Sequence, residues 1–311
     1  MTVPNISIII VSWNVKNYLR ECIISIYKAS GGVSLEVIVV DNASTDYSAE
    51  MIIREFPKVR LVRNDRNLGF SRANNQAIKL SHGKYILFLN PDTVIIDKSI
   101  DMLHSFIENH NEVIVVGPMI LNADGKTIQY QCARTFPTLW REFCGLSEIS
   151  IHLKNIPSFS YINLDYWDHK DSKYIDLISG ACMMCRKEIV EKINLFDEDY
   201  FLYADDVDFC FRMREHGLIY YLAEAKIIHY GGQSSRQSDD DLWLLRCDST
   251  RIFFKKHKGL HYSLGYRAVV ILSQVIRFIL ILISNIRKAK FPPKESIMQI
   301  WKLIQWGLHF K

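Results

Sequence analysis

Residues 6–14 read ISIIIVSWN, a run rich in β-branched side chains that ends in polar residues. An unbroken apolar run of this length is typical of a strand covered on both faces, as in a parallel sheet. Outward from it, strand-like and helical segments alternate. The pattern predicts strands over 35–40, 59–62 and 85–89. It predicts helices over 18–28, from the turn at 41–46 to about residue 56, and over 71–80. This order predicts an α/β fold with a doubly wound, mostly parallel, Rossmann-like sheet and right-handed crossovers.

Length and composition exclude several classes of protein. The 311 residues are 49% hydrophobic and 23% charged, which predicts a large folded core. A net charge of +4, with no basic stripe, does not favour nucleic-acid binding. The seven cysteines are an odd number among apolar neighbours, which is typical of reduced core residues in a cytosolic protein. No secretory signal precedes the first predicted strand.

Polar tripeptides follow three of the four predicted strands: SWN at 12–14, DNA at 41–43 and NPD at 90–92. Ligands of doubly wound sheets bind outside the carboxyl ends of the strands. Asp92 has two interpretations, as a carboxylate facing that ligand or as a cap of the next helix. Asp41 and Asn42 end a neighbouring strand in the same way, which favours a ligand site.

The segment 64–75, NDRNLGFSRANN, joins a predicted strand to a predicted helix. Gly69 permits a positive φ or a close backbone approach. Arg66 and Arg72, together with the N–H groups that begin the helix, are candidates for contacting a phosphate. The alternative is an ordinary capped loop, because the segment is neither a P-loop nor a G-x-G-x-x-G fingerprint.

An acidic cluster, YADDVD at 203–208, opens a helix predicted over 205–216. Asp205 or Asp206 is a candidate N-cap. Three carboxylates in four positions exceed what capping needs, so one of them is a candidate general base, with Arg212 nearby.

His229 ends the strand or pair of strands predicted over 218–229 and precedes a Gly-Gly turn. It is interpreted either as a core histidine or as a contact to metal or phosphate. Between these motifs, strands are predicted over 113–117 and 175–185 and a short helix over 186–192. The aromatic-rich stretch 130–171 lacks periodicity, which favours a substrate loop.

The carboxyl-terminal segment 268–286 is long enough to suggest a membrane span. Arg277 lies at its centre, where a charge is disfavoured by ~2.5–3.5 kcal/mol on insertion scales. Basic residues and a second amphipathic piece with Trp301 and Trp306 follow. The pattern favours a helix lying in the membrane surface; the alternatives are a tail packed on the protein or a partner subunit, and a true span. The polar residues of the segment 268–286 fall in one sector of the predicted helix: Ser273, Gln274, Arg277, Ser284 and Asn285.

Taken together, the motifs resemble the family 2 inverting glycosyltransferases of the GT-A fold, and especially bacterial rhamnosyltransferase-like enzymes. The resemblance covers roughly residues 5–260 and includes RIFFKKHKG at 251–259. It implies a glycosyltransferase domain over 1–260, with a nucleotide-sugar-binding half (1–118) and an acceptor-binding half (119–260). Residues 261–311 are then an amphipathic helical tail. The other motifs are VSWN (11–14), VVDNASTD (39–46), NLGFSRANN (67–75), LNPDT (89–93), ISGACMM (178–184), YADDVDFCFR (203–212) and HYGGQSS (229–235).

The resemblance also implies roles for single residues. Asp92 matches the metal-binding carboxylate of the Asp-x-Asp motif, whereas Asn90 departs from the acidic residue expected in its first position. His229 matches a position that binds the metal, Mg²⁺ or Mn²⁺, or the diphosphate. Asp205 and Asp206 match the family's catalytic Glu-Asp pair, with Asp206 as the base. The residues expected to bind the nucleotide-sugar are Ser12, Asn14, Asp41 at the base, Asn42, Arg66, Asn67, Gly69, Asn74, Asn90 and Arg212.

The function implied is inverting transfer of a sugar, first of all rhamnose from dTDP-rhamnose, to a glycan or polyprenyl-diphosphate-linked acceptor. Such an enzyme builds O-antigen, capsule or a related polysaccharide in the cytoplasm, on the inner face of the cell membrane, and a homo-oligomer is compatible with this function. One alternative is a sugar nucleotidyltransferase, but residues 12–16 lack the Gly-rich basic loop expected of one. The other is a non-catalytic nucleotide-sugar sensor or scaffold, which the presence of Asp92, Asp206 and His229 disfavours.

Overall fold

The computed structural model describes residues 4–29, 31–153, 155–234, 241–288 and 294–309, and their side chains except those of 284–288 and 294–296. Contacts within the chain define two compact units. The first comprises residues 1–134 and 169–240, and the second comprises residues 135–168 and 241–311. The domain boundaries expected from the sequence, 1–260 and 261–311, stay a prediction.

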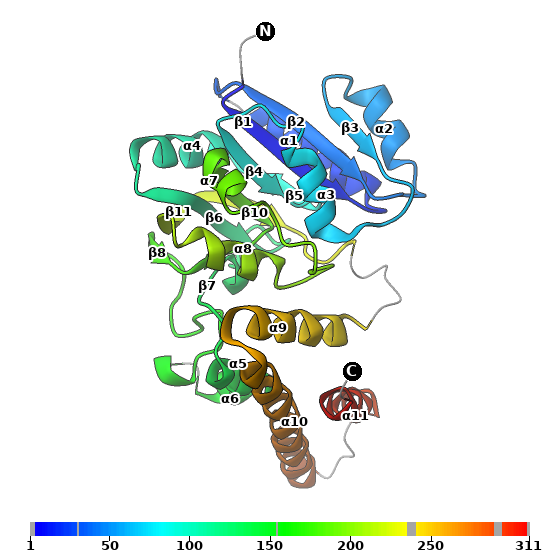
Figure 1. Ribbon diagram of the computed structural model, residues 1–311, viewed down its shortest axis with the longest axis vertical. Helices are drawn as coiled ribbons and strands as arrows, with labels where there is room; N and C mark the ends of the chain where they lie inside the picture. The colour runs from blue at the N-terminus through cyan, green and yellow to red at the C-terminus, as the bar shows by residue number, and fades with distance from the viewer. Residues whose placement is uncertain (1–3, 30, 154, 235–240, 289–293, 310–311) are drawn as a thin grey trace. The chain divides into compact units, whose positions relative to one another are not determined.

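The amino-terminal half of the first unit alternates strands and helices as predicted (Figure 1). Strand β1 pairs in parallel with β2 on one side and β4 on the other, and β2 pairs in parallel with β3. All four isoleucines of β1 are fully buried, which is why an unbroken apolar run forms this central strand. The elements are β1 (Ile6–Ser12), α1 (Lys16–Ala29), β2 (Leu35–Asp41), α2 (Ser48–Glu55), β3 (Arg60–Arg63), α3 (Gly69–Ile78) and β4 (Tyr85–Leu89).

The rest of the first unit extends the same sheet in the order β3-β2-β1-β4-β10-β6-β11-β5, with β8 on β11, while β7 and β9 pair antiparallel in a separate two-stranded sheet. Strand β10 runs antiparallel to both its neighbours, and β11 runs parallel to β6. The elements are β5 (Thr93–Ile95), α4 (Ser99–Asn109), β6 (Val113–Leu121), η1 (Tyr130–Cys132), β7 (Ala133–Arg134), β8 (Lys173–Ile175), β9 (Leu177–Ile178), β10 (Cys182–Arg186), α7 (Lys187–Lys192), α8 (Asp205–Met213) and β11 (Leu218–His229).

The single strand predicted over 175–185 is wrong, because the structure has three short strands there. At 179–181 the chain passes from the two-stranded sheet to the large one, and backbone N–H groups bind other partners. Ser179 donates to the carbonyl of Cys132, and Gly180 donates to the Asp206 carboxylate. The break in the strand thus brings backbone donors to an acidic side chain.

Three parts of the chain meet at the carboxyl edge of the sheet. The strand order reverses at β1, between β2 and β4, and such a switch point opens a ligand crevice at the carboxyl ends. Antiparallel β10 begins at this edge, with Cys182 opposite Leu89. The last residue of β11, His229, pairs with Thr93 just after the NPD tripeptide.

The second unit is helical. Its elements are α5 (Leu139–Leu146), α6 (Ile149–His152), η2 (Pro157–Phe159), α9 (Leu242–Lys258), α10 (Leu260–Lys288) and α11 (Lys294–Leu308). The prediction of a substrate loop over 130–171 is therefore wrong for the part that forms α5, α6 and η2. Local caps begin two of these helices: Thr138 accepts from Arg141 N, and Asp241 accepts from the N–H groups of Trp243 and Leu244.

Helix α10 turns its polar stripe toward its own unit. Ser273 and Gln274 are buried, and Gln274 donates to the carbonyl of Leu146 at 3.3 Å. Arg277 pairs with Glu148 at 2.8 Å. Ser284 and Asn285 of the predicted stripe lie outside the described side chains. By length and composition alone, Leu260–Ile283 is a candidate membrane span. The exposed face is apolar and carries Leu264, Leu272, Val275, Ile279, Leu280, Leu282 and Ile283.

Candidate active site

The ends of β1 and β2 carry two buried oxygens that need a partner. Ser12 and Asp41 lie opposite each other in the parallel register, and both are buried. Asp41 Oδ2 accepts from the N–H of Ser44 at 3.1 Å. Within the described residues, Ser12 Oγ and Asp41 Oδ1 have no hydrogen-bond partner. Because buried polar atoms are nearly always paired, these two point to a polar ligand at the end of the strands.

Asn42 connects this edge to the loop before α3. Its N–H donates to the Ser12 carbonyl at 2.8 Å, and its Nδ2 donates to the Gly69 carbonyl at 3.1 Å. Gly69 has a φ of 79°, and a Cβ there would lie 2.6 Å from the carbonyl oxygen of Phe201. Asn67 Oδ1 accepts from the N–H of Gly69 at 2.9 Å. Glycine is thus required at position 69, and the loop is held by side-chain amides on both sides.

The remaining residues predicted for the nucleotide differ in placement. Asn14, with a φ of 54°, accepts from the N–H of Thr45 through Oδ1 at 2.7 Å, which joins the loops after β1 and β2. Asn74 Nδ2 donates back to the carbonyl of Phe70 within α3 at 2.9 Å. Arg66 is exposed at the loop surface. Asn14 is therefore joined to the group formed by Ser12, Asp41 and Asn42.

A second group forms where β4 and β11 end and β5 begins. The Asp92 side chain is buried, with Oδ1 3.2 Å from His229 Nε2. Asn90 Nδ2 lies 3.3 Å from the same nitrogen, which places Asn90 in this group.

The chemistry of this second group fits a hard divalent cation. One carboxylate oxygen and one imidazole nitrogen converge, and the carboxylate is the kind of oxygen ligand that Mg²⁺ and Mn²⁺ prefer. In the described part of the chain, no cluster of three or more His, Cys, Asp or Glu forms a complete protein cage. Mg²⁺ usually keeps several waters and binds substrate phosphates, so two protein ligands suffice for a metal–diphosphate site.

The acidic cluster lies at the start of α8. Asp206 Oδ2 accepts from Arg134 in an ion pair and from the N–H of Gly180 at 3.1 Å. Asp205 is buried and accepts from the N–H of Asp206 at 2.8 Å. Burial and the adjacent Asp206 charge raise the pKa of the Asp205 carboxyl. The capping interpretation is wrong, since the N-cap residue is Ala204 and no side chain caps the helix.

Arg212 holds α8 in place. It pairs with Asp208 at 2.8 Å and donates to the carbonyls of Ile193 at 2.7 Å and Leu195 at 2.9 Å. The sequence predicted Arg212 near the general base of the acidic cluster. Within the described residues, however, its hydrogen bonds and ion pairs do not include Asp205 or Asp206. This arginine therefore anchors the helix that carries the acidic pair.

The break between β9 and β10 links the second group to the acidic cluster. Asn90 N donates to the carbonyl of Ala181 at 2.9 Å, while the adjacent Gly180 donates to Asp206. The two groups are therefore joined through consecutive peptide units. Such a short connection suits a site where a cation and a base act on one substrate.

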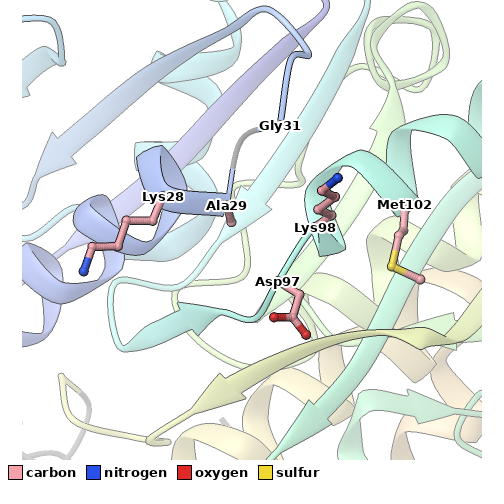
Figure 2. A pocket seen from close by; sticks show the side chains of 6 residues that line it. All are labelled: Lys28, Ala29, Gly31, Asp97, Lys98 and Met102. Atoms are coloured by element: carbon pink, nitrogen blue, oxygen red, sulfur yellow. The ribbon is translucent and has the colours of Figure 1, made fainter.

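A cavity of about 480 Å³ lies elsewhere in the first unit (Figure 2). Its walls come from the end of α1 and the start of α4, and include Lys28, Asp97, Lys98 and Met102. None of its lining residues belongs to the groups described above.

Sequence reasoning missed three contributors to the site: Gln129, Arg134 and Gly180. Gln129 contacts His229 across 100 residues of sequence, and Arg134 contacts Asp206 across 72. Gln129 and Arg134 flank the start of the stretch interpreted as a substrate loop. No spacing in the sequence distinguishes them from other polar residues.

Comparison with known proteins agrees with this geometry. The model of the family described as Glycosyl transferase family 2 matches residues 7–193, which is more than half of the chain. The chain belongs to that family. It is a glycosyltransferase, and the activity predicted from its motifs is confirmed.

Curated relatives of this glycosyltransferase carry related names. An N-acetylglucosaminyl-diphospho-decaprenol L-rhamnosyltransferase of Mycobacterium tuberculosis is 26% identical over 238 residues, covering 72% of this chain and 76% of that protein. Rhamnosyltransferase WbbL of Escherichia coli K12 is 29% identical over 177 residues, covering 54% of this chain and 63% of that protein.

Solved structures with low sequence identity confirm the GT-A fold of this glycosyltransferase. Mannosyltransferase PcManGT from Pyrobaculum calidifontis, in complex with GDP-Man and Mn²⁺, has a TM-score of 0.57 and 14% identity, covering 98% of this chain and 86% of that one. Residues 1–349 of S. aureus TarS have a TM-score of 0.53 and 16% identity, covering 88% and 80%.

Proposed function

We propose that this glycosyltransferase moves a sugar, with inversion, from a nucleotide-sugar to an acceptor hydroxyl, using Asp206 as the base. The observation that carries the proposal is the link from Asn90, beside Asp92 and His229, through Ala181 and Gly180 to Asp206. The first candidate donor is dTDP-rhamnose, because two relatives are named rhamnosyltransferases.

The donor nucleotide would lie at the ends of β1 and β2. Ser12 Oγ and Asp41 Oδ1, buried without partners in the described residues, would hydrogen-bond to the base. Asp92 and His229 would hold Mg²⁺ or Mn²⁺, which supplies positive charge to the diphosphate leaving group. Asn42 and Gly69 keep the flanking loop against the strand end.

Asp206 would take the proton of the attacking hydroxyl on the face opposite the diphosphate. Both hydrogen bonds to this carboxylate found in the described residues go to Oδ2, from Arg134 and Gly180. They fix the side chain and leave Oδ1 to receive the proton. A positioned base of this kind typically contributes about 10²–10⁴-fold to the rate.

A lipid-linked acceptor and attachment to a membrane surface follow from the same proposal. The M. tuberculosis relative is named for a decaprenol-linked substrate. In α10 the polar stripe contacts its own unit and the apolar face is exposed, the reverse of a helix on a soluble protein. The basic residues Lys255, Lys256 and Lys258 immediately precede α10 and suit anionic headgroups. A membrane lying on this face would cover it while leaving Arg277 paired.

Replacing Leu272 and Ile279 by Glu should weaken binding to phosphatidylglycerol-containing vesicles by at least about tenfold, because each buried Leu or Ile contributes about 1.5–3 kcal/mol. Both side chains are exposed, at 54% and 48%, so the fold should be retained. Vesicle flotation measures the change. The control carries two glutamates at exposed apolar positions of the first unit, Ile53 and Tyr174. Equal flotation of all three proteins would contradict the membrane assignment.

A panel of nucleotide-sugars tests the donor. Purified enzyme with Mn²⁺ and a polyprenyl-diphosphate-linked acceptor should release nucleoside diphosphate fastest with dTDP-rhamnose. Anomeric analysis of the product by NMR should give the inverted configuration. If nucleoside diphosphate is released fastest from another donor, that donor replaces dTDP-rhamnose in the proposal. A product with the retained anomeric configuration would contradict the role of Asp206.

A further inference from the structure

We infer that Gln129 is a positioning residue for His229: its amide holds the imidazole in the form protonated at Nδ1, with Nε2 turned to Asp92. The consequence for cation binding rests on the proposed function, whereas the hydrogen-bond geometry does not. Gln129 lies outside the motifs on which the family resemblance depends.

The backbone of Gln129 is fixed on both sides. After β6 the chain turns through 122–127, closed by a hydrogen bond from Asn122 N to the Thr127 carbonyl at 2.8 Å. Gln129 N then donates to the Ile120 carbonyl at 2.8 Å, and its own carbonyl accepts from Cys132 N at 3.0 Å. The residue is therefore anchored to the sheet strand β6 and begins the turn η1.

The side chain of Gln129 contacts His229 at two points. Gln129 Nε2 lies 2.6 Å from the backbone carbonyl of His229, and Oε1 lies 3.0 Å from His229 Nδ1. A carbonyl only accepts, so the amide must present its NH₂ group there. Its oxygen then faces Nδ1, and since that oxygen only accepts, Nδ1 must carry a hydrogen.

This arrangement opposes what Asp92 alone would select. A neutral imidazole beside a carboxylate would place its hydrogen on Nε2, donating to Asp92 Oδ1 at 3.2 Å. That hydrogen would block the lone pair that a cation needs. With the hydrogen on Nδ1 instead, the Nε2 lone pair and Asp92 Oδ1 converge, and a cation between them satisfies both.

The test compares Gln129→Leu with the wild-type protein. Long-range ¹H–¹⁵N spectra of the imidazoles, with His229 assigned through His229→Asn, should report Nδ1–H in neutral wild-type His229 and predominantly Nε2–H in the variant. Electron paramagnetic resonance titration should give Mn²⁺ affinity about 10–100-fold weaker in the variant, as is typical when a partner of a metal-binding histidine is removed.

Two further variants separate positioning from folding. Gln129→Glu keeps an acceptor for Nδ1 and should retain the Nδ1–H form. Thr127→Val removes the hydroxyl that accepts from Asn122 in the same hairpin and should leave His229 and Mn²⁺ affinity unchanged. An Nδ1–H signal and wild-type Mn²⁺ affinity in a folded Gln129→Leu protein would overturn the inference. If the variant shifts the tautomer but wild-type protein binds no Mn²⁺ with nucleotide, the inference on Gln129 stands and the metal role in the proposed function falls.

Discussion

Asp206→Asn is expected to lower the turnover number for sugar transfer by about 10²–10⁴-fold, the usual contribution of a positioned general base. Asparagine keeps the size of the side chain and an oxygen that can accept from Arg134 and Gly180, the two donors that hold Asp206. What it loses is the ability to take a proton. Donor and Mn²⁺ affinities should therefore stay near wild type, as measured by calorimetry, while nucleoside diphosphate release falls.

Two other variants make this result specific. Glu215→Gln removes an exposed carboxylate just after α8 and should retain activity. Asp205→Asn decides between the members of the acidic pair. Burial and the charge of Asp206 raise the pKa of Asp205, which favours its neutral form, so its replacement should cost less than that of Asp206. Full activity of Asp206→Asn, or a larger loss for Asp205→Asn, would remove Asp206 as the base.

The predicted strands agree with the structure where burial dictates the sequence. Tyr85–Leu89 has the predicted bounds and the run quoted at 6–14 forms β1 (Ile6–Ser12), because a strand covered on both faces is apolar at most positions. Prediction fails where the pattern is mixed. The segment 175–185 is mostly apolar but contains Asp176 and Ser179, and the N–H of Gly180 binds Asp206, a contact that no local periodicity encodes.

The site residues likewise divide into those that the local sequence predicts and those that it does not. Ser12, Asp41 and Asp92 were predictable because each ends or closely follows a recognisable strand, and parallel strands end at one edge. Gln129 and Arg134 were not, since their partners lie 100 and 72 residues away in sequence. They act through orientation of another side chain, so their residue type carries little information on its own.

In α10 the sequence pattern predicts a polar stripe but not which way it faces. Gln274 and Arg277 fall in one sector of the wheel, as expected, and on a soluble protein that sector would face water. The structure turns it inward, because Leu146 offers a carbonyl to Gln274 and Glu148 offers a carboxylate to Arg277. Residues more than a hundred positions away in sequence thus decide that the apolar side is exposed.

Asp92→Asn should weaken Mn²⁺ binding in the presence of nucleoside diphosphate and reduce turnover by about 10²–10³-fold, since charge stabilisation of a leaving group by a metal contributes several kcal/mol. The amide can still accept from the N–H of Gln233, as Asp92 Oδ2 does at 3.3 Å, so the local fold should persist. Electron paramagnetic resonance of Mn²⁺ and steady-state kinetics measure the two effects. The control is Asp176→Asn, which removes the same charge at an exposed position between β8 and β9 and should change neither Mn²⁺ binding nor turnover.

The alternative is that Asp92 and His229 form only a structural ion pair joining β5 to β11. The two cases predict different losses for the Asp92→Asn variant. A structural pair predicts that Asp92→Asn lowers the melting temperature and leaves Mn²⁺ affinity unchanged. A cation site predicts that Asp92→Asn weakens Mn²⁺ binding and does not lower the melting temperature. The reason is that the wild-type protein without metal holds a buried carboxylate beside an imidazole nitrogen turned toward it. Unchanged Mn²⁺ affinity with a lower melting temperature would therefore exclude Asp92 from metal binding.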